Sequence, residues 1–525
     1  MIFNIFVKKN GNWKDDTLSG LTVALALVPE AIAFSFIAGV DPIVGLWSAV
    51  FLGLITSSFG GRPGMISGAT GAIAVVVAKV VDIGTQDGLA MGIDNLGMQY
   101  LFATLMLAGI IQGLVGAFKL GRFIRLVPHP VMMGFVNGLA ILILLAQFDS
   151  FRGLDGNWLP EQQLYVMAGL AALTMFIIQF FPRISNAVPS ILVAIVGVSL
   201  LTYFDVVSTK TIADVLFEGT GSAELNGTMP MLVWPGDIVW NQQTIMLIGG
   251  VSLTVAMVGL IESLMTLQLI DDMTETRGQG NRECFAQGGA NFLSGLFGGM
   301  GGCAMIGQSL INIKSGGRGR TSGVVAALTL TALIMVGGPV ISQIPIAALV
   351  GVMFMVVIGT FEWSSFNTIG KVPSSEVIVI LVVTLVTVFM HNLALAVFAG
   401  VIVSALVFAW ENAQHVWLNP HDIDDKTRIY NLQGVLYFGS VREFSDSMSP
   451  ATDPDQVIID FKHARVADYS SMEALNALTE RYRKAGKRLR LRHLSPECQK
   501  MIKTAGKLIE IEVAEDDPHY SVARI

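Results

Sequence analysis

The chain has 525 residues, of which 53% are hydrophobic and only 14% are charged, and its formal net charge is −7. Soluble globular proteins carry about a quarter charged residues, so this composition and a mean hydropathy of +0.62 exclude a disordered chain, a collagen-like repeat and a disulfide scaffold. The negative net charge also gives no basic footprint for nucleic acid. Of the 73 Lys, Arg, Asp and Glu residues, 34 lie in residues 411–525. This distribution predicts a membrane body followed by a charged soluble domain.

Apolar stretches recur through residues 1–410 at lengths suited to a hydrocarbon layer about 30 Å thick. They predict fourteen spans, several of which are too short to cross alone. If the N-terminus lies inside the cell, most Lys and Arg residues of this part fall in cytoplasmic segments, as the positive-inside rule requires. The start of the chain is polar, so we expect no cleavable signal peptide. The predicted spans are 18–39, 43–60, 64–82, 97–118, 128–148, 163–181, 188–205, 243–265, 284–298, 301–312, 322–338, 346–362, 375–392 and 393–410.

The spans divide into two similar halves of seven. Thr22 precedes Glu30 by eight residues, and Thr254 precedes Glu262 by the same interval. A Gly-containing run follows each glutamate at a similar distance. Because seven is odd, the two halves must be inverted relative to each other. Inverted repeats with Gly-interrupted short segments are typical of secondary transporters that bind substrate near the bilayer midplane.

The two Gly-containing runs form the candidate substrate site. Extended backbone survives at membrane depth only where it lines a cavity or is buried in protein. If a helix begins after each run, the free N–H groups and positive dipole ends of both helices point at the midplane and favour an anion. The alternative is tight helix packing by small residues. The candidate substrate-binding residues are Ser67, Gly68, Ala69, Thr70, Gly71, Gly301, Gly302, Cys303 and Ala304.

Glu30 and Glu262 are ionisable residues inside apolar spans, which makes them functional candidates. Such a carboxylate holds Na⁺ together with hydroxyl and carbonyl oxygens, or takes up a proton with the substrate. Ser263 and Thr266 follow Glu262, and Thr266 lies on the same helical face. We therefore expect cation coupling at Glu262, Ser263, Thr266 and Glu30, with Na⁺ at Glu262 and with no cofactor. Glu30 has a second interpretation, in which it only hydrogen-bonds a broken helix.

From about residue 428 the pattern changes to that of a small α/β domain, and residues 411–427 are expected to be a linker. No phosphate-binding loop, metal cluster or catalytic constellation is visible in this domain, so we expect no enzyme activity. The expected elements are strands at 429–441, 456–461 and 488–494 and an amphipathic helix at 470–487.

Several stretches resemble the sulfate permease (SulP) family of anion transporters. Leu21–Phe34 resembles the signature of the family's first span, and Gly121–Pro130 is the most specific match. Residues 312–318 resemble the end of the family's tenth span. Residues 428–525 are similar to the STAS domain that closes these proteins.

The resemblance implies how the chain is organised. In a membrane domain of residues 1–410, a core of spans 1–4 and 8–11 moves against a gate of spans 5–7 and 12–14. The anion sits between the starts of spans three and ten, and the family's acidic residue of span eight matches Glu262. The resemblance also implies a homodimer and a cytoplasmic STAS domain, which we expect to bind a cytoplasmic regulator.

Two departures from the family pattern bear on the substrate. Many relatives have a basic residue after the tenth helix start, where this chain has Gly307-Gln308-Ser309, and the family often has Gln at the position of Glu30. The missing positive charge favours cation-coupled uptake, as in the cyanobacterial Na⁺-dependent bicarbonate branch. We expect a Na⁺-coupled symporter for bicarbonate or sulfate in the bacterial inner membrane, with both termini cytoplasmic. The alternatives are a proton-coupled dicarboxylate symporter, a nucleobase transporter, an anion channel or exchanger, and a membrane-tethered signalling scaffold.

Overall fold

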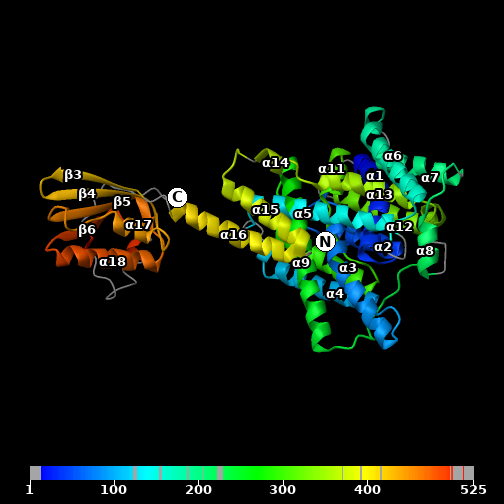
Figure 1. Cartoon of the computed structure of the whole chain (residues 1–525), viewed down its shortest axis with the longest axis horizontal. Coiled ribbons are helices and arrows are strands. Elements are labelled where there is room, and N and C mark those ends of the chain that lie inside the picture. The colour runs from blue at the N-terminus through cyan, green and yellow to red at the C-terminus, as the bar shows by residue number, and fades with distance from the viewer. Residues whose placement is uncertain are drawn as a thin grey trace. The chain divides into compact units, whose positions relative to one another are not determined.

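The computed structural model divides into two compact units, Met1–Val401 and Ile402–Ile525. The first is helical, and the second contains a five-stranded sheet (Figure 1). The stretch 122–126, which carries much of the most specific family match, lies outside the described residues. The described residues are 13–121, 127–152, 157–185, 189–204, 206–220, 229–368, 370–390, 393–413, 417–496, 498–500 and 512–513.

A helix occupies each of the fourteen predicted spans. Two further short helices, α8 (Ile212–Thr220) and α14 (Ser364–Thr368), lie in predicted loops. The helices within the predicted spans are α1 (Trp13–Ala38), α2 (Pro42–Phe59), α3 (Gly71–Met91), α4 (Leu96–Ala117), α5 (His129–Gln147), α6 (Glu161–Phe180), α7 (Ser190–Tyr203), α9 (Gln242–Thr274), α10 (Gly280–Leu296), α11 (Ile306–Lys314), α12 (Arg320–Ile341), α13 (Ile346–Thr360), α15 (Ser374–Met390) and α16 (Leu393–Ala413).

Length and composition separate these helices. Among the described residues, eight helices are long and apolar enough to cross a membrane, and three shorter ones are also apolar. The protein is therefore a multi-pass membrane protein, and the number of fourteen crossings stays a prediction. The short α11, with nine residues, spans about 14 Å at 1.5 Å per residue, so it reaches only part of the way across the hydrocarbon layer.

The helices of the first unit pack as two groups. One group contains α1–α4 and α9–α12, and the other contains α5, α6, α7, α13 and α15. Between the groups, α1 and α3 contact α5, α7 and α13. Of an 18-residue apolar stretch within α1, 72% is buried, whereas 28% of the corresponding stretch that begins with α6 is buried. A helix that is apolar all round and buried belongs to the interior, so α1 is central and α6 peripheral.

Local sequence sets the helix starts. The Asp41 side chain accepts a hydrogen bond of 2.9 Å from the Ile43 N–H at the start of α2, where Pro42 is the first helical residue. Within α1, Pro29 has no N–H to donate, so it cannot complete the helical ladder one residue before Glu30. The helix that carries this glutamate is therefore weakened beside it.

The second unit is built around one sheet with the strand order β3–β4–β5–β6–β7. β3 is antiparallel to β4, and the other neighbouring strands are parallel. Parallel neighbours need crossover connections, and α18 supplies the one between β5 and β6. The elements are β3 (Trp417–Asp424), β4 (Thr427–Leu436), α17 (Val441–Asp446), β5 (Gln456–Val466), α18 (Tyr469–Lys484), β6 (Arg488–Arg492) and β7 (Glu512–Val513).

The predicted linker 411–427 is wrong in part, because β3 occupies Trp417–Asp424 and pairs with β4. Seven of its eight residues are exposed, so it lacks the alternation of buried apolar residues by which a strand is recognised. As an edge strand, β3 joins the sheet mainly through its backbone hydrogen bonds.

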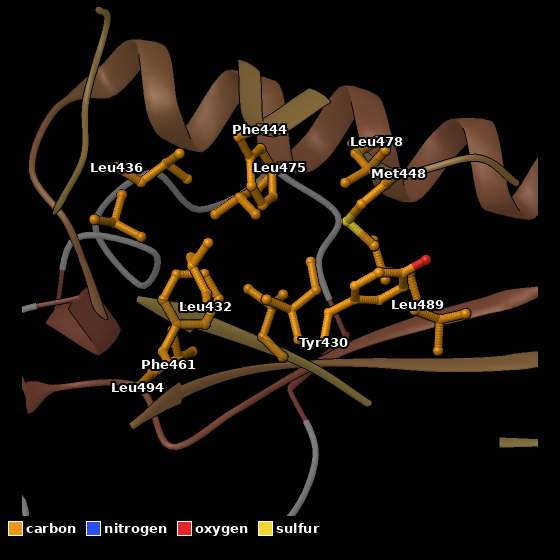
Figure 2. Close-up of a cluster of buried hydrophobic side chains, with 14 of the residues drawn as sticks. Tyr430, Leu432, Leu436, Phe444, Met448, Phe461, Leu475, Leu478, Leu489 and Leu494 are labelled. Carbon is orange, nitrogen blue, oxygen red and sulfur yellow. The ribbon is translucent and has the colours of Figure 1, made fainter. Parts of the chain in front are cut away.

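Apolar side chains fill the space between α18 and the sheet. Figure 2 shows Leu475 and Leu478 of α18 above Tyr430 and Leu432 of β4 and Leu489 of β6. All are buried. The helix contributes one apolar face and the parallel strands contribute the other, which confirms a small α/β domain in this part of the chain.

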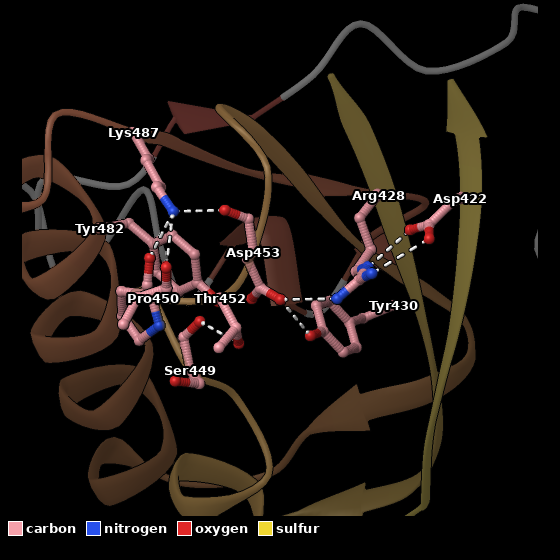
Figure 3. A network of polar contacts seen from close by, with 10 residues as sticks. Asp422, Arg428, Tyr430, Ser449, Pro450, Thr452, Asp453, Tyr482 and Lys487 are labelled. Carbon is pink, nitrogen blue, oxygen red and sulfur yellow. Dashed lines mark hydrogen bonds and ion pairs between the residues drawn. The ribbon is translucent and has the colours of Figure 1, made fainter. Parts of the chain in front are cut away.

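A polar network anchors the loop between α17 and β5 (Figure 3). The buried Asp453 carboxylate accepts hydrogen bonds from the Arg428 guanidinium (2.9 Å), the Tyr430 hydroxyl (2.8 Å) and the Tyr482 hydroxyl. Lys487 donates to the carbonyls of this loop, including that of Pro450 at 2.7 Å. Burial and the contact with Asp453 raise the pKa of Tyr482 above its usual range. The network ties the loop to β4 and α18.

Asp453→Ala is expected to destabilise this domain by about 2–4 kcal/mol, because it leaves three donors without their shared acceptor. Hydrogen exchange of β4, β5 and α18 in the full-length protein measures the loss. Asp422→Ala is the matched control, since Asp422 binds the same Arg428 from an exposed position, and exchange in this variant should remain close to wild type. Equal effects of the two substitutions would contradict the stabilising role of Asp453.

Candidate ion-binding site

The two Gly-containing runs lie side by side. Their short strands β1 (Ser67–Gly68) and β2 (Cys303–Ala304) are antiparallel, with Ser67 opposite Ala304 and Gly68 opposite Cys303. The helices α3 and α11 begin three residues after β1 and two residues after β2. The condition set for an anion site, that a helix begins after each run, is therefore met, although the predicted spans 64–82 and 301–312 began before α3 and α11 do.

Neither helix start is capped by a side chain. Thr70 and Met305 are the N-cap residues of α3 and α11, and neither makes a side-chain capping bond. The first N–H groups of a helix have no partner within the helix and carry partial positive charge. Two such starts that meet at one strand crossing make a favourable environment for an anion.

Glycine is required where β2 approaches β1. Gly301 has φ +73°, a left-handed conformation that other residues adopt at a cost. A Cβ on Gly302 would overlap the backbone carbonyl of Gly68. Larger residues at these two positions would force the strands apart, so the crossing depends on the small residues that the sequence shows.

All nine predicted substrate-binding residues, Ser67–Gly71 and Gly301–Ala304, are buried. Within the first turn of α11, by contrast, Gly307 is exposed, and a Cβ there would meet nothing within 4 Å. The nine residues thus build the crossing, while Gly307 marks the side from which the α11 start can be approached.

The predicted coupling residues of α9 contact β2 directly. The Cys303 thiol donates to Glu262 Oε2 at 2.9 Å, and the Thr70 hydroxyl lies 3.2 Å from the same sulfur. The Ser263 hydroxyl accepts from the Ala304 N–H at 3.1 Å. The structure therefore brings Glu262 and Ser263 to the crossing, where each contacts a residue of β2.

Thr266 completes this contact one helical turn further along α9. Its hydroxyl donates to the Glu262 carbonyl at 2.8 Å and lies 3.4 Å from the Ala304 carbonyl. Among the described residues, no group of three or more His, Cys, Asp or Glu side chains is arranged to hold a metal ion. A cation here would therefore be held by one carboxylate with hydroxyl and carbonyl oxygens, the ligands that suit hard cations rather than transition metals.

Glu30 lies in a different environment. Its Oε1 accepts a hydrogen bond of 2.7 Å from Gln308 Nε2, in the first turn of α11. No hydrogen bond joins it to Glu262 in the described part of the chain. The two glutamates that match in the repeat thus reach the crossing through different partners, Cys303 for Glu262 and Gln308 for Glu30.

Sequence reasoning missed a further buried carboxylate beside the crossing. Glu283 of α10 accepts from the Gly61 N–H at 2.7 Å and from Gln287 Nε2 at 3.1 Å. Gln287 also donates to the Ser67 hydroxyl at 2.8 Å. The chain Glu283–Gln287–Ser67 links the loop after α2 to β1. The available signal was a glutamate followed by a glutamine at i+4 in a Gly-rich stretch.

This arrangement defines a class of protein: a multi-pass membrane protein with two discontinuous segments that meet inside a helical body, followed by an α/β domain. Residues 13–383 match the model of the Sulfate permease family, and residues 421–517 match that of the STAS domain. The chain belongs to the sulfate permease family, which consists of transporters and not of enzymes.

Named relatives cover nearly the whole chain. It is 41% identical over 493 residues to the putative sulfate transporter YbaR of Bacillus subtilis, covering 94% of this chain and 97% of YbaR. It is 29% identical over 482 residues to the bicarbonate transporter BicA of Picosynechococcus sp., covering 86% of this chain and 83% of BicA.

Solved structures show the same architecture. The transmembrane domain of a cyanobacterium bicarbonate transporter BicA matches with a TM-score of 0.62 and 28% identity, covering 76% of this chain and 98% of that one. Murine Slc26a9, an anion transporter in the inward-facing state, matches with a TM-score of 0.78 at 17% identity, covering 96% of this chain and 90% of that one. The second likeness is one of fold alone.

Proposed function

We propose that this protein is a secondary active transporter that imports a small inorganic anion, bicarbonate or sulfate, together with Na⁺. The anion binds at the starts of α3 and α11, and Na⁺ binds at Glu262. The observation that carries the proposal is the crossing of β1 and β2, where two uncapped helix starts meet beside a single carboxylate.

The anion assignment rests on electrostatics and on relatives. Two helix N-termini stabilise negative charge without a fixed cation, and the first turn of α11 carries the neutral Gln308. The relatives YbaR and BicA are named as sulfate and bicarbonate transporters. These observations support a small oxyanion as the substrate.

The cation assignment rests on Glu262. A bound Na⁺ would lie near its carboxylate and near the hydroxyls of Thr266 and Thr70, and would offset the repulsion between the carboxylate and an incoming anion. Binding of each ion then favours binding of the other, which is the energetic basis of symport.

The two packing groups support a mechanism of alternating access. The group of α1–α4 and α9–α12 carries the whole site and acts as the core, and the group of α5–α7, α13 and α15, extended by α16, acts as the gate. Movement of one against the other exposes the site to each side in turn. We place the protein as a homodimer in the bacterial inner membrane with both termini in the cytoplasm, where the STAS domain binds a regulator.

Uptake into proteoliposomes tests the proposal. Labelled bicarbonate, sulfate and fumarate are offered with an imposed Na⁺ or H⁺ gradient, and accumulation of bicarbonate or sulfate driven by inward Na⁺ is expected. Accumulation of fumarate driven by protons would establish the dicarboxylate alternative instead. Flux that never exceeds equilibrium would indicate a channel or an exchanger, and absence of uptake of all three anions would refute the proposal.

A further inference from the structure

Glu30 and Gln308 form an isolated polar pair between α1 and the first turn of α11. Glu30 is 7% exposed and Gln308 is 1% exposed. Gln308 donates through Nε2 to Glu30 Oε1 at 2.7 Å. Its other polar atom, Oε1, is buried without a hydrogen-bond partner among the described residues. A buried acceptor without a donor is costly, so the pair is incompletely satisfied when Glu30 is ionised.

No described cation neutralises Glu30. The helices that pack against α1 are α2, α3, α7, α11, α12 and α13, and α2, α7 and α13 carry no Asp, Glu, Lys, Arg or His. The charged residues of the other three helices have other surroundings. Lys79, Asp82 and Lys314 are exposed. Asp87 accepts a hydrogen bond from the Tyr100 hydroxyl, and Arg320 donates hydrogen bonds to the backbone carbonyls of Ser57, Ser58 and Gly60.

An ionised Glu30 competes with the transported anion. Gln308 is the third residue of α11, so the carboxylate lies beside the positive end of the helix that an anion would use. The Glu30 carboxylate also occupies the amide NH₂ of Gln308, whose hydrogen bond an anion would otherwise accept. Glu30 is thus a tethered negative charge at one half of the substrate site.

Protonation removes this competition. A neutral Glu30 can donate its O–H to Gln308 Oε1, the acceptor that otherwise has no partner, after the amide turns over. The NH₂ group of Gln308 is then released toward the start of α11. The proton comes from water on the side to which the site is open, and Glu30 returns it to water on the other side, so the step makes and breaks only O–H bonds.

We infer that Glu30 is a proton-binding site, separate from the Na⁺ site at Glu262, and that its protonation frees Gln308 and the α11 start for the transported anion. The inference rests on the proposed function and adds to it a second coupling ion. It assigns Glu30 and Gln308 together as the pair that makes anion affinity depend on pH. The linkage is reciprocal, so a bound anion also favours protonation of Glu30.

The pH dependence of the Michaelis constant tests the inference. In proteoliposomes with saturating Na⁺, the constant of the wild-type protein for sulfate or bicarbonate should fall as the pH falls, by up to about tenfold per pH unit for one obligatory proton. Bicarbonate is tested only in the range where it remains the monoanion. Glu30→Gln keeps the shape of the side chain and removes its titratable carboxyl group, so the Michaelis constant of this variant should not vary with pH. Glu376→Gln, an exposed glutamate of α15, should behave as wild type.

Each outcome decides the matter. If wild-type protein takes up an anion and Glu30→Gln keeps the wild-type pH profile, the inference is overturned while the proposed function stands. If wild-type protein takes up neither anion, both fail. Should Glu30→Gln not fold, the wild-type protein alone suffices, since a Michaelis constant independent of pH would also overturn the inference.

Discussion

Replacing Gly307 by phenylalanine is expected to reduce anion uptake strongly without unfolding the protein. Gly307 is exposed in the first turn of α11, and a Cβ there meets nothing within 4 Å, so the ring can be accommodated. It would cover the N–H groups of this turn, from which an anion would gain its stabilisation. Initial uptake should fall at least about tenfold, equivalent to about 1.4 kcal/mol of binding free energy.

Two controls separate blocked access from damage to the fold. Gly307→Ala adds only a methyl group and favours the helix by up to about 1 kcal/mol, so uptake should persist. Gly289→Phe places the same ring at an exposed glycine of α10 that also has open space around its Cβ, and it should transport normally. Normal uptake by Gly307→Phe would show that the anion does not approach α11 from this side.

Replacing Glu262 by glutamine is expected to remove Na⁺-driven accumulation. The amide keeps the size of the side chain and an acceptor for Cys303, but it carries no charge. At about 4 Å and an effective dielectric constant near 20, a carboxylate and a monovalent cation attract each other by about 4 kcal/mol. Desolvation offsets part of this, so apparent Na⁺ affinity should fall at least about a hundredfold, measured as the Na⁺ concentration for half-maximal uptake.

A second carboxylate on the same helix provides the comparison. Asp272 lies near the end of α9 and is exposed, so Asp272→Asn should leave the Na⁺ dependence unchanged. If Glu262→Gln still accumulates anion with the wild-type Na⁺ dependence, the cation site lies elsewhere and the coupling role of Glu262 is wrong.

The halves of the candidate site could be predicted because each is encoded locally. Small residues in each run indicated that the backbone could be extended there, and α3 and α11 begin at Gly71 and at Ile306, at the ends of the two runs. The repeat then predicted that the two runs are equivalent. Pairing of the runs was an inference from symmetry, and the antiparallel register of Ser67 with Ala304 confirms that they meet.

The partners of the buried acids could not be predicted in the same way. Glu30 and Gln308 are 278 positions apart, and Glu283 reaches Gly61 across 222 positions. No periodicity relates such residues, because contacts across these separations depend on how whole helices pack. The edge strand β3 was missed for a related reason, since its pairing uses backbone groups that every residue has.

By itself, the sequence determined the apolar helices, the separate α/β domain, the two Gly-containing runs and the acids that lie within apolar stretches. Each of these follows from composition or from spacing over a few turns. The tertiary structure alone decided that Cys303 donates to Glu262, that Gln308 holds Glu30 and that Gly307 remains exposed. The physical reason is that a buried polar group must find its partner in space, and in this fold the strand or helix that supplies the partner comes from the other half of the chain or from beyond a loop.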